Sequence, residues 1–295
     1  MAILGSPAHK SPRRILFATD FSACSETALL YGVGLCRRLE ARLYTVTVVS
    51  AELTFDAQPP DPFYLRHSAE KKMAMIVNSG VFQDIEHFEM VKEGFEPVSQ
   101  ILLELIDTLQ IDLIVLGMRG RNGLKKLMLG SVAEEVVNCA PCPVLTVGPH
   151  VPPKSSSKLK LGVILCTTDL QPGSERVLTY ALTLADEDAH LTLLHVLKTS
   201  TNSRSELIKI KAQSEVELNQ LLQLNAPNSS PLLEIQSVVE IGAPDERIPK
   251  VAEDLHADLI VIGPHHTNHP RIAAHLPWAM LHRVLSQAQC PVLRV

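Results

Sequence analysis

The sequence repeats itself once along its length, and this repeat limits the folds available to the chain more than any other feature. Near the start, ILFATDFSACSETALLYGVGL aligns with VILCTTDLQPGSERVLTYALTL, which matches Asp20 with Asp169. IDLIVLG ending at Gly117 then answers ADLIVIG ending at Gly263, and the copies close on CPVLTV and CPVLRV. Each copy has the size of a whole domain rather than of a solenoid unit. We therefore predict two tandem domains, residues 1–150 and 151–295, joined by a segment rich in Pro, Ser and Lys.

Short β-rich runs alternate with helical patterns within each copy. In the first copy the sequence predicts strands at 15–18, 42–49, 85–91, 113–116 and 144–147, and helices at 25–39, 97–109 and 131–138. A further helix-like run follows PPDP in the stretch 51–79, and its counterpart 205–224 has the apolar spacing of an amphipathic helix. Such alternation implies right-handed crossovers and a mainly parallel sheet with helices on both faces, so the predicted fold class is α/β.

Composition narrows the classes of partner. Hydrophobic residues make up 46% and charged residues 20%, which excludes a disordered chain, and the net charge of −5 argues against a general electrostatic grip on nucleic acid or anionic membrane. No apolar run approaches the roughly 18 residues of a membrane span, and the opening residues hold too short an apolar stretch for a signal peptide. We therefore expect a cytoplasmic protein with no nucleic-acid or membrane partner, whose six cysteines stay reduced.

Two features of the first copy stand at predicted strand ends, where open α/β sheets bind ligands. One is Asp20, and the other reads G-x2-G-x9-G-S from Gly117 to Ser131. Glycines let the backbone approach a ligand closely, and a helix beginning near Ser131 would point free N–H groups at an anion, which together describe a phosphate cradle. The alternative is a set of ordinary turns followed by an N-cap serine. The P-loop and dinucleotide-binding signatures are absent after the first strand.

The strand ending in Asp20, the DLIVLG before the Gly-Ser motif and the closing APCPVL resemble the universal stress protein family in its tandem form. The resemblance implies two doubly wound domains, each with a five-stranded mainly parallel sheet, related to the adenine nucleotide alpha hydrolase-like group. One branch of the family binds ATP through this motif. By that resemblance Asp20 would contact the nucleoside and Val48 the adenine. The ribose and phosphates would be lined by Gly117, Arg119 and Gly120, and phosphate oxygens bound by Gly130, Ser131 and Val132.

The second copy departs from this pattern. No second glycine follows Gly263 at the matching place, and Pro277-Trp278 falls near where Gly-Ser is expected. We therefore predict that this copy does not bind ATP in the family's way and is structural or regulatory. Its histidine-rich segment, with histidines at 265, 266, 269, 275 and 282, suggests either a zinc or nickel site or a polar loop; the lack of close Cys or carboxylate ligands favours the loop.

Two smaller motifs have structural interpretations. Cys139 and Cys142 have C-x-x-C spacing, but the pair closes a helix rather than opening one, so we expect packing rather than redox chemistry. Asp112 and Asp258 each precede a buried strand and are expected to cap or solvate the turn there.

Three functional hypotheses remain. The leading one is an ATP-binding stress-response regulator that holds its nucleotide in the first domain, with or without magnesium. The alternatives are a slow ATP hydrolase at the same site, with no catalytic residue assigned, and an interaction module that binds no nucleotide. Family members commonly pair through the last strand, so 144–147 and 292–295 are expected to meet within the chain, and a homodimer is also open.

Overall fold

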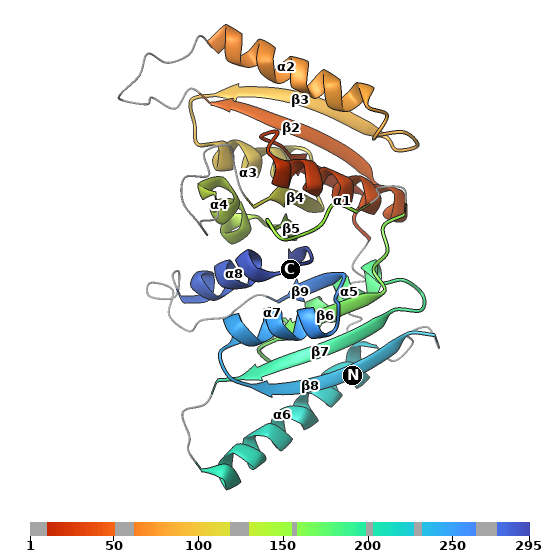
Figure 1. Ribbon diagram of the computed structural model, residues 1–295, viewed down its shortest axis with the longest axis vertical. Helices are drawn as coiled ribbons and strands as arrows, with labels where there is room; N and C mark the ends of the chain where they lie inside the picture. Colours follow the sequence, from red (N-terminus) through yellow and green to blue (C-terminus); the bar gives the residue numbers. More distant parts are fainter. Residues whose placement is uncertain are drawn as a thin grey trace, which may run out of the picture.

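One sheet runs through both domains of the computed structural model (Figure 1). The structure describes residues 11–50, 62–118, 130–154, 158–198, 203–226, 232–263 and 276–295. Within these ranges ten strands join in the order β3-β2-β1-β4-β5-β10-β9-β6-β7-β8. The two domains therefore share a continuous backbone hydrogen-bond network instead of touching only through side chains.

The first domain alternates strand and helix as predicted. Its elements are β1 (Arg14–Ala18), α1 (Ala23–Leu39), β2 (Arg42–Ser50), α2 (Pro62–Asn78), β3 (His87–Gly94), α3 (Val98–Thr108), β4 (Leu113–Gly117), α4 (Ser131–Cys139) and β5 (Val144–Val147). Pro97, expected inside the first turn of a helix, is instead the N-cap of α3. Both positions suit proline, because neither needs an amide donor to the helix.

The second domain repeats this order. Its elements are β6 (Val163–Thr168), α5 (Glu175–Leu184), β7 (His190–Leu197), α6 (Arg204–Asn225), β8 (Glu234–Ile241), α7 (Pro244–Asp254), β9 (Leu259–Ile262), α8 (Leu276–Gln287) and β10 (Val292–Arg294). The helix expected over 205–224 forms, but its predicted apolar face is only partly used, since Ile208 is 60% and Val216 51% exposed. Leu218, Leu221 and Leu222 of α6 pack against the core, whereas Leu224 is 78% exposed.

Strand pairing is parallel within each domain and antiparallel between them. β1 lies between β2 and β4, and β6 lies between β7 and β9. At the seam β10 runs antiparallel to β5, with Val292 opposite Thr146 and Arg294 opposite Val144. This contact covers an edge that each domain alone would expose.

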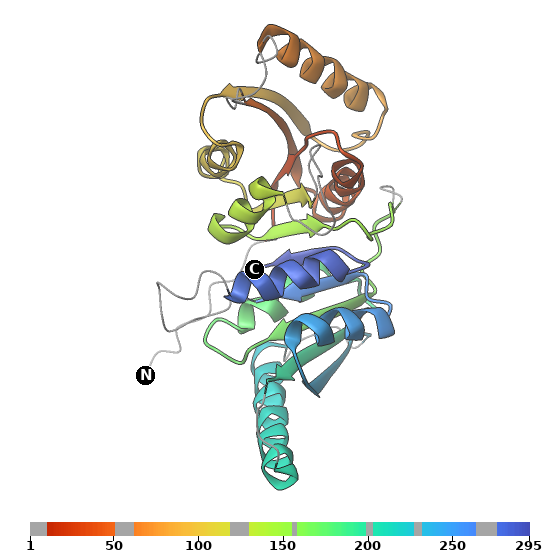
Figure 2. The ribbon, with the colours of Figure 1, turned by 60° about the vertical axis from the view of Figure 1, so that its left-hand side comes forward.

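Helices cover both faces of the sheet (Figure 2). One apolar cluster joins the sheet to α1, α2, α5 and α6, and the other joins it to α3, α4, α7 and α8. Each cluster contains residues of both domains, including Leu145 with Leu293 and Val144 with Val292. The α/β fold class predicted from the sequence, with two tandem five-stranded units, is confirmed.

The two aspartates predicted to cap turns accept hydrogen bonds from the backbone at the starts of β1 and β6. Asp112 Oδ2 accepts hydrogen bonds from the amides of Arg13 and Arg14 at 2.8 and 2.9 Å. Asp258 Oδ2 does the same for Gly162 and Val163 at 3.0 and 3.1 Å. Both therefore cap the turn, as expected. Among the described residues, no helix is long and apolar enough to span a bilayer.

Candidate functional site

The carboxyl ends of three strands meet at one edge of the first domain. Ala18 of β1 lies opposite Val46 of β2 and Leu116 of β4, so β1 and β4 end at nearly the same level, while β2 continues to Ser50. Asp20 follows β1, and Gly117 is the last residue of β4. This is the edge at which ligands bind in open parallel sheets.

The turn after β1 is held by a compact set of polar contacts. Thr19 and Ser25 share a side-chain hydrogen bond of 2.5 Å, and the Phe21 amide donates to Thr19 Oγ1 at 3.0 Å. Asp20 Oδ1 accepts from the Ser22 amide at 3.0 Å, and Ser22 caps α1. Phe21 has φ of 62°, a left-handed conformation uncommon for a bulky residue. Such local strain is often found at functional sites.

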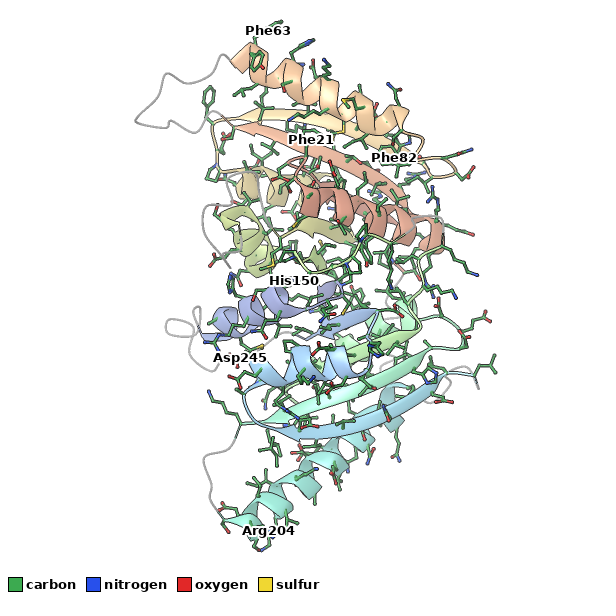
Figure 3. All side chains as sticks on the ribbon, in the orientation of Figure 1. Phe21, Phe63, Phe82, His150, Arg204 and Asp245 are labelled. Carbon is green, nitrogen blue, oxygen red and sulfur yellow. The ribbon has the colours of Figure 1, made fainter. Side chains whose placement is uncertain are left out.

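Thr19 and Ser25 were not among the residues singled out from the sequence. The signal was present, because the repeat aligns Thr19 with Thr168 and Ser25 with Ser174 beside the matched aspartates. Phe21, labelled in Figure 3, also carries a cation contact, since Lys72 Nζ of α2 lies 5.5 Å from its ring centroid. The turn is thus fixed both from the sheet and from α2.

Gly117 is required by the close approach of β4 to α1. A Cβ at this position would lie 2.7 Å from the Ser25 amide nitrogen and 2.8 Å from the Cys24 carbonyl carbon. Both are backbone atoms, which cannot turn aside as a side chain can. The strand end therefore comes within contact of the start of α1, beside the turn that carries Asp20.

The start of α4 reaches the same edge. The Gly130 amide donates to the Met118 carbonyl at 3.1 Å, and the Met118 amide donates to Val147 O of β5 at 2.9 Å. Gly130 is the N-cap, and its carbonyl accepts from the Glu134 amide at 3.0 Å. The first-turn amides of a helix have no partner within the helix, so α4 presents N–H donors at Ser131 and Val132 with the positive end of its dipole.

Of the other predicted site residues, one lies on β2 and two lie outside the described part of the chain. Val48 is half-buried and sits two residues beyond Val46 on β2, which brings it level with Asp20. Arg119 and Gly120 lie outside the described residues. The structure thus brings Asp20, Val48 and Gly117 to one edge together with Gly130, Ser131 and Val132.

The second domain keeps the turn but changes the helix. Asp169 Oδ1 accepts from the Gln171 amide at 3.1 Å, and Leu170 has φ of 61°. When Cys142 and Cys290 are aligned, the counterpart of Ser131 is Ala279, yet α8 begins at Leu276, almost one turn earlier. The helix backbone therefore extends into positions that precede α4 in the first domain.

The histidine-rich segment lies mostly outside the described part of the chain. Histidines 265, 266, 269 and 275 lie outside the described residues, while His282 belongs to α8. Over the segments that are described, no group of three or more His, Cys, Asp or Glu side chains could hold a metal ion.

The cysteines occur as free thiols, all six of them within described segments. Burial raises the pKa of the Cys142 thiol from 9.0 to about 12, and the same cause raises that of Cys290 to about 12. A thiol needs a lowered pKa for redox or nucleophilic work at neutral pH. The environment of Cys142 agrees with the packing role expected from the sequence, whereas Cys139 is exposed and does not have that role.

Comparison with known proteins identifies the class. The model of the universal stress protein family matches residues 12–148 and again 161–295, so the chain belongs to this family and is a tandem member of it. The predicted boundary between residues 150 and 151 falls between the two matched segments.

Relatives of known sequence and structure agree with this assignment. Universal stress protein MJ0531 of Methanocaldococcus jannaschii is 30% identical over 142 residues, which are 46% of this chain and 81% of that protein. A universal stress protein of Archaeoglobus fulgidus superposes with a TM-score of 0.67 at 17% identity, covering 97% of this chain and 96% of its own. A functionally unknown protein, PA1789 of Pseudomonas aeruginosa, gives a TM-score of 0.65 at 18% identity over 98% and 94% of the two chains. At these identities the two structures support the fold.

Proposed function

We propose that the first domain binds ATP, and that this tandem universal stress protein acts as a nucleotide-dependent regulator in the stress response. The observation that carries the proposal is the convergence of Asp20, the Gly117 strand end and the N-terminus of α4 at one sheet edge. The helix start suits phosphate oxygens, and a carboxylate two residues beyond a strand suits the hydroxyls of a ribose.

We infer that Val48 contacts adenine, because it extends the same edge on the neighbouring strand β2. Arg119 and Gly120 complete the proposed set by their place in the Gly-rich motif. Magnesium, when bound with ATP, would supply positive charge between the phosphates.

We infer further that the second domain binds no ATP in this way. The early start of α8 at Leu276 supports this, because helical backbone there replaces the Gly-Ser turn that precedes α4 in the first domain. The expected stoichiometry is one ATP per chain, with the second domain in a structural or regulatory role.

The test is a Gly130→Asp variant titrated with ATP and magnesium by calorimetry. Gly130 has φ −64° and ψ 140°, which any residue adopts, and aspartate is a favoured N-cap, so the variant should fold normally. Its carboxylate would repel a phosphate at the helix start, and binding should be lost. The matched control is Ser203→Asp, which places the same carboxylate at the N-cap of α6, far along the chain from the site.

The outcomes separate the hypotheses. One ATP per wild-type chain, lost only in Gly130→Asp, supports the proposal. Two per chain would contradict the assignment of the second domain, and none would favour an interaction module. Chromatography of the bound nucleotide after hours with magnesium distinguishes a binder, which returns ATP, from a hydrolase, which returns ADP.

A further inference from the structure

One hydrogen bond crosses from the second domain to the helix that carries the proposed phosphate cradle. Arg294 of β10 donates from Nη1 to the carbonyl oxygen of Val137 at 2.6 Å. Val137 lies in the last turn of α4, where carbonyls have no donor within the helix. The Ala140 amide donates to the Val136 carbonyl at 2.9 Å, and the Val137 carbonyl accepts its hydrogen bond from the second domain.

Strand pairing fixes the position of Arg294. β10 lies between β5 and β9, and Arg294 is opposite Val144 on one side and Ile262 on the other. Burial lowers the pKa of its guanidinium, and the nearby charge of Arg176 lowers it further. Arginine nevertheless stays protonated at neutral pH, and a cation is favoured at the carbonyl end of a helix.

The matching positions of the first domain hold different residues. The counterpart of Arg294 is Thr146, which is 1% exposed and too short to reach a helix end. Leu285 of α8, the counterpart of Val137, instead faces Gly148, where a Cβ would lie 2.7 Å from the Leu285 carbonyl oxygen. A charged side chain donates to the end of α4, whereas the matching carbonyl of α8 lies against the backbone of Gly148.

The two ends of α4 therefore have different neighbours, the proposed phosphate site at its N-terminus and the second domain at its C-terminus. The helix has nine residues and is about 13 Å long, with Gly130 and Ser131 at one end and the Arg294 contact at the other. We propose that Arg294 is a positioning residue, supplied by the second domain, that fixes the tilt of α4 and so aims its first-turn amides at the nucleotide phosphates. This inference rests on the proposed ATP site in the first domain.

Thermodynamic linkage makes the idea measurable. If the Arg294 contact favours nucleotide binding, then bound nucleotide must favour the contact by the same factor. ATP should therefore slow amide exchange at the end of α4 and along β10. Such a change reports on coupling, which a residue that only held the domains together would leave unaltered.

The experiment titrates ATP and magnesium into the wild-type chain, Arg294→Met and Arg294→Lys. Methionine keeps much of the length and apolar contact without the donors, and affinity should fall about fivefold, near the lower end of typical coupling. Lysine keeps one charged donor and should give an intermediate loss. The control Arg283→Met removes an exposed arginine of α8 that pairs with Asp245 at 2.7 Å, and should leave affinity unchanged.

Hydrogen exchange of each variant with and without ATP supplies the second readout. We expect ATP to slow exchange at the end of α4 and in β10 in the wild type, but not in Arg294→Met. Wild-type affinity and a wild-type response to ATP in Arg294→Met, with Gly130→Asp inactive, would overturn this inference and leave the proposed function standing. A wild-type chain that binds no ATP would overturn both. Should Arg294→Met fail to fold, an unchanged exchange response in Arg294→Lys decides against the inference.

Discussion

The carboxyl edges of the two domains share one turn and differ in the helix that follows the fourth strand. In both turns a threonine Oγ1 accepts, at 3.0 Å, the amide of a residue with positive φ: Thr19 serves Phe21, and Thr168 serves Leu170. The helix starts differ, since α4 begins after a glycine N-cap and α8 begins at Leu276. The geometry of the turn is shared by the two domains and so does not distinguish them, whereas the helix start differs and is where a ligand requirement would be kept or lost.

The largest difference between the two domains is expected for Gly117, the last residue of β4, and Gly263, which follows β9. Gly117→Ala would press a Cβ against backbone atoms of Cys24 and Ser25, whereas Gly263→Ala would meet Val177 Cγ2, a side-chain atom, at 2.8 Å. We expect Gly117→Ala to lose about 1–3 kcal/mol of unfolding free energy, and Gly263→Ala a smaller amount because side chains adjust more easily than backbone. Urea denaturation of the two variants measures this. Equal losses would show that both domains pack their strand ends equally tightly.

The aspartates of the two turns provide a second test, with a smaller effect. Asp20→Asn and Asp169→Asn each keep an Oδ1 acceptor for the turn amide, so their structural costs should match. The proposed site predicts that Asp20→Asn weakens ATP binding about tenfold, because a charged hydrogen bond is worth about 1.5 kcal/mol or more. Asp169→Asn should bind as the wild type does. An equal loss in both variants would point to an ATP site in each domain.

One property should be the same in the two domains, the alkaline pH dependence that a buried cysteine gives to stability. Cys142 and Cys290 occupy matching positions, and burial raises the pKa of each to about 12. The unfolded chain loses these protons near pH 9 while the folded chain keeps them, so stability is full below pH 8 and falls as pH rises toward 12. Between about pH 8 and 9.5 each thiol should cost about 1 kcal/mol of unfolding free energy.

The measurement is the slope of unfolding free energy against pH for Cys142→Ala and Cys290→Ala. Both variants should flatten the alkaline fall by the same amount. A difference between them would place one of the two strand starts in a wetter environment than its counterpart.

Much of the fold could be predicted from the sequence because local patterns fix it. The alternation of apolar runs with helical spacing predicted the strands and most helices of the first copy, and the repeat implied the same order in the second. Helix starts were harder: α1 begins at Ala23 after Ser22, although 25–39 was predicted. Ser22, Cys24 and Ser25 are all small residues, so the pattern does not mark which one caps. The apolar spacing of α6 likewise did not reveal that Ile208 and Val216 are exposed.

The sequence predicted individual residues of the candidate site but not how they lie relative to one another. Spacing identified Asp20 and the glycines, but the level of Val48 depends on the register of β1 and β2, which no motif carries. Arg294 could not be found from sequence, because its contact with Val137 depends on how two domains meet. Thr146, at the position that matches Arg294 in the repeat, does not indicate a contact of this kind.

The antiparallel pairing of β5 and β10 has a consequence for how the two halves can evolve. A dimer of identical chains joined about a twofold axis must use the same residues on both sides of its interface, so each change appears twice. Covalent linkage removes that symmetry requirement. Here Arg294 faces Val137 on one side of the seam and Gly148 faces Leu285 on the other, an arrangement that a symmetric homodimer could not adopt. Joining the copies in one chain thus permits a division of labour in which one half keeps a ligand site and the other is free to specialise in supporting it.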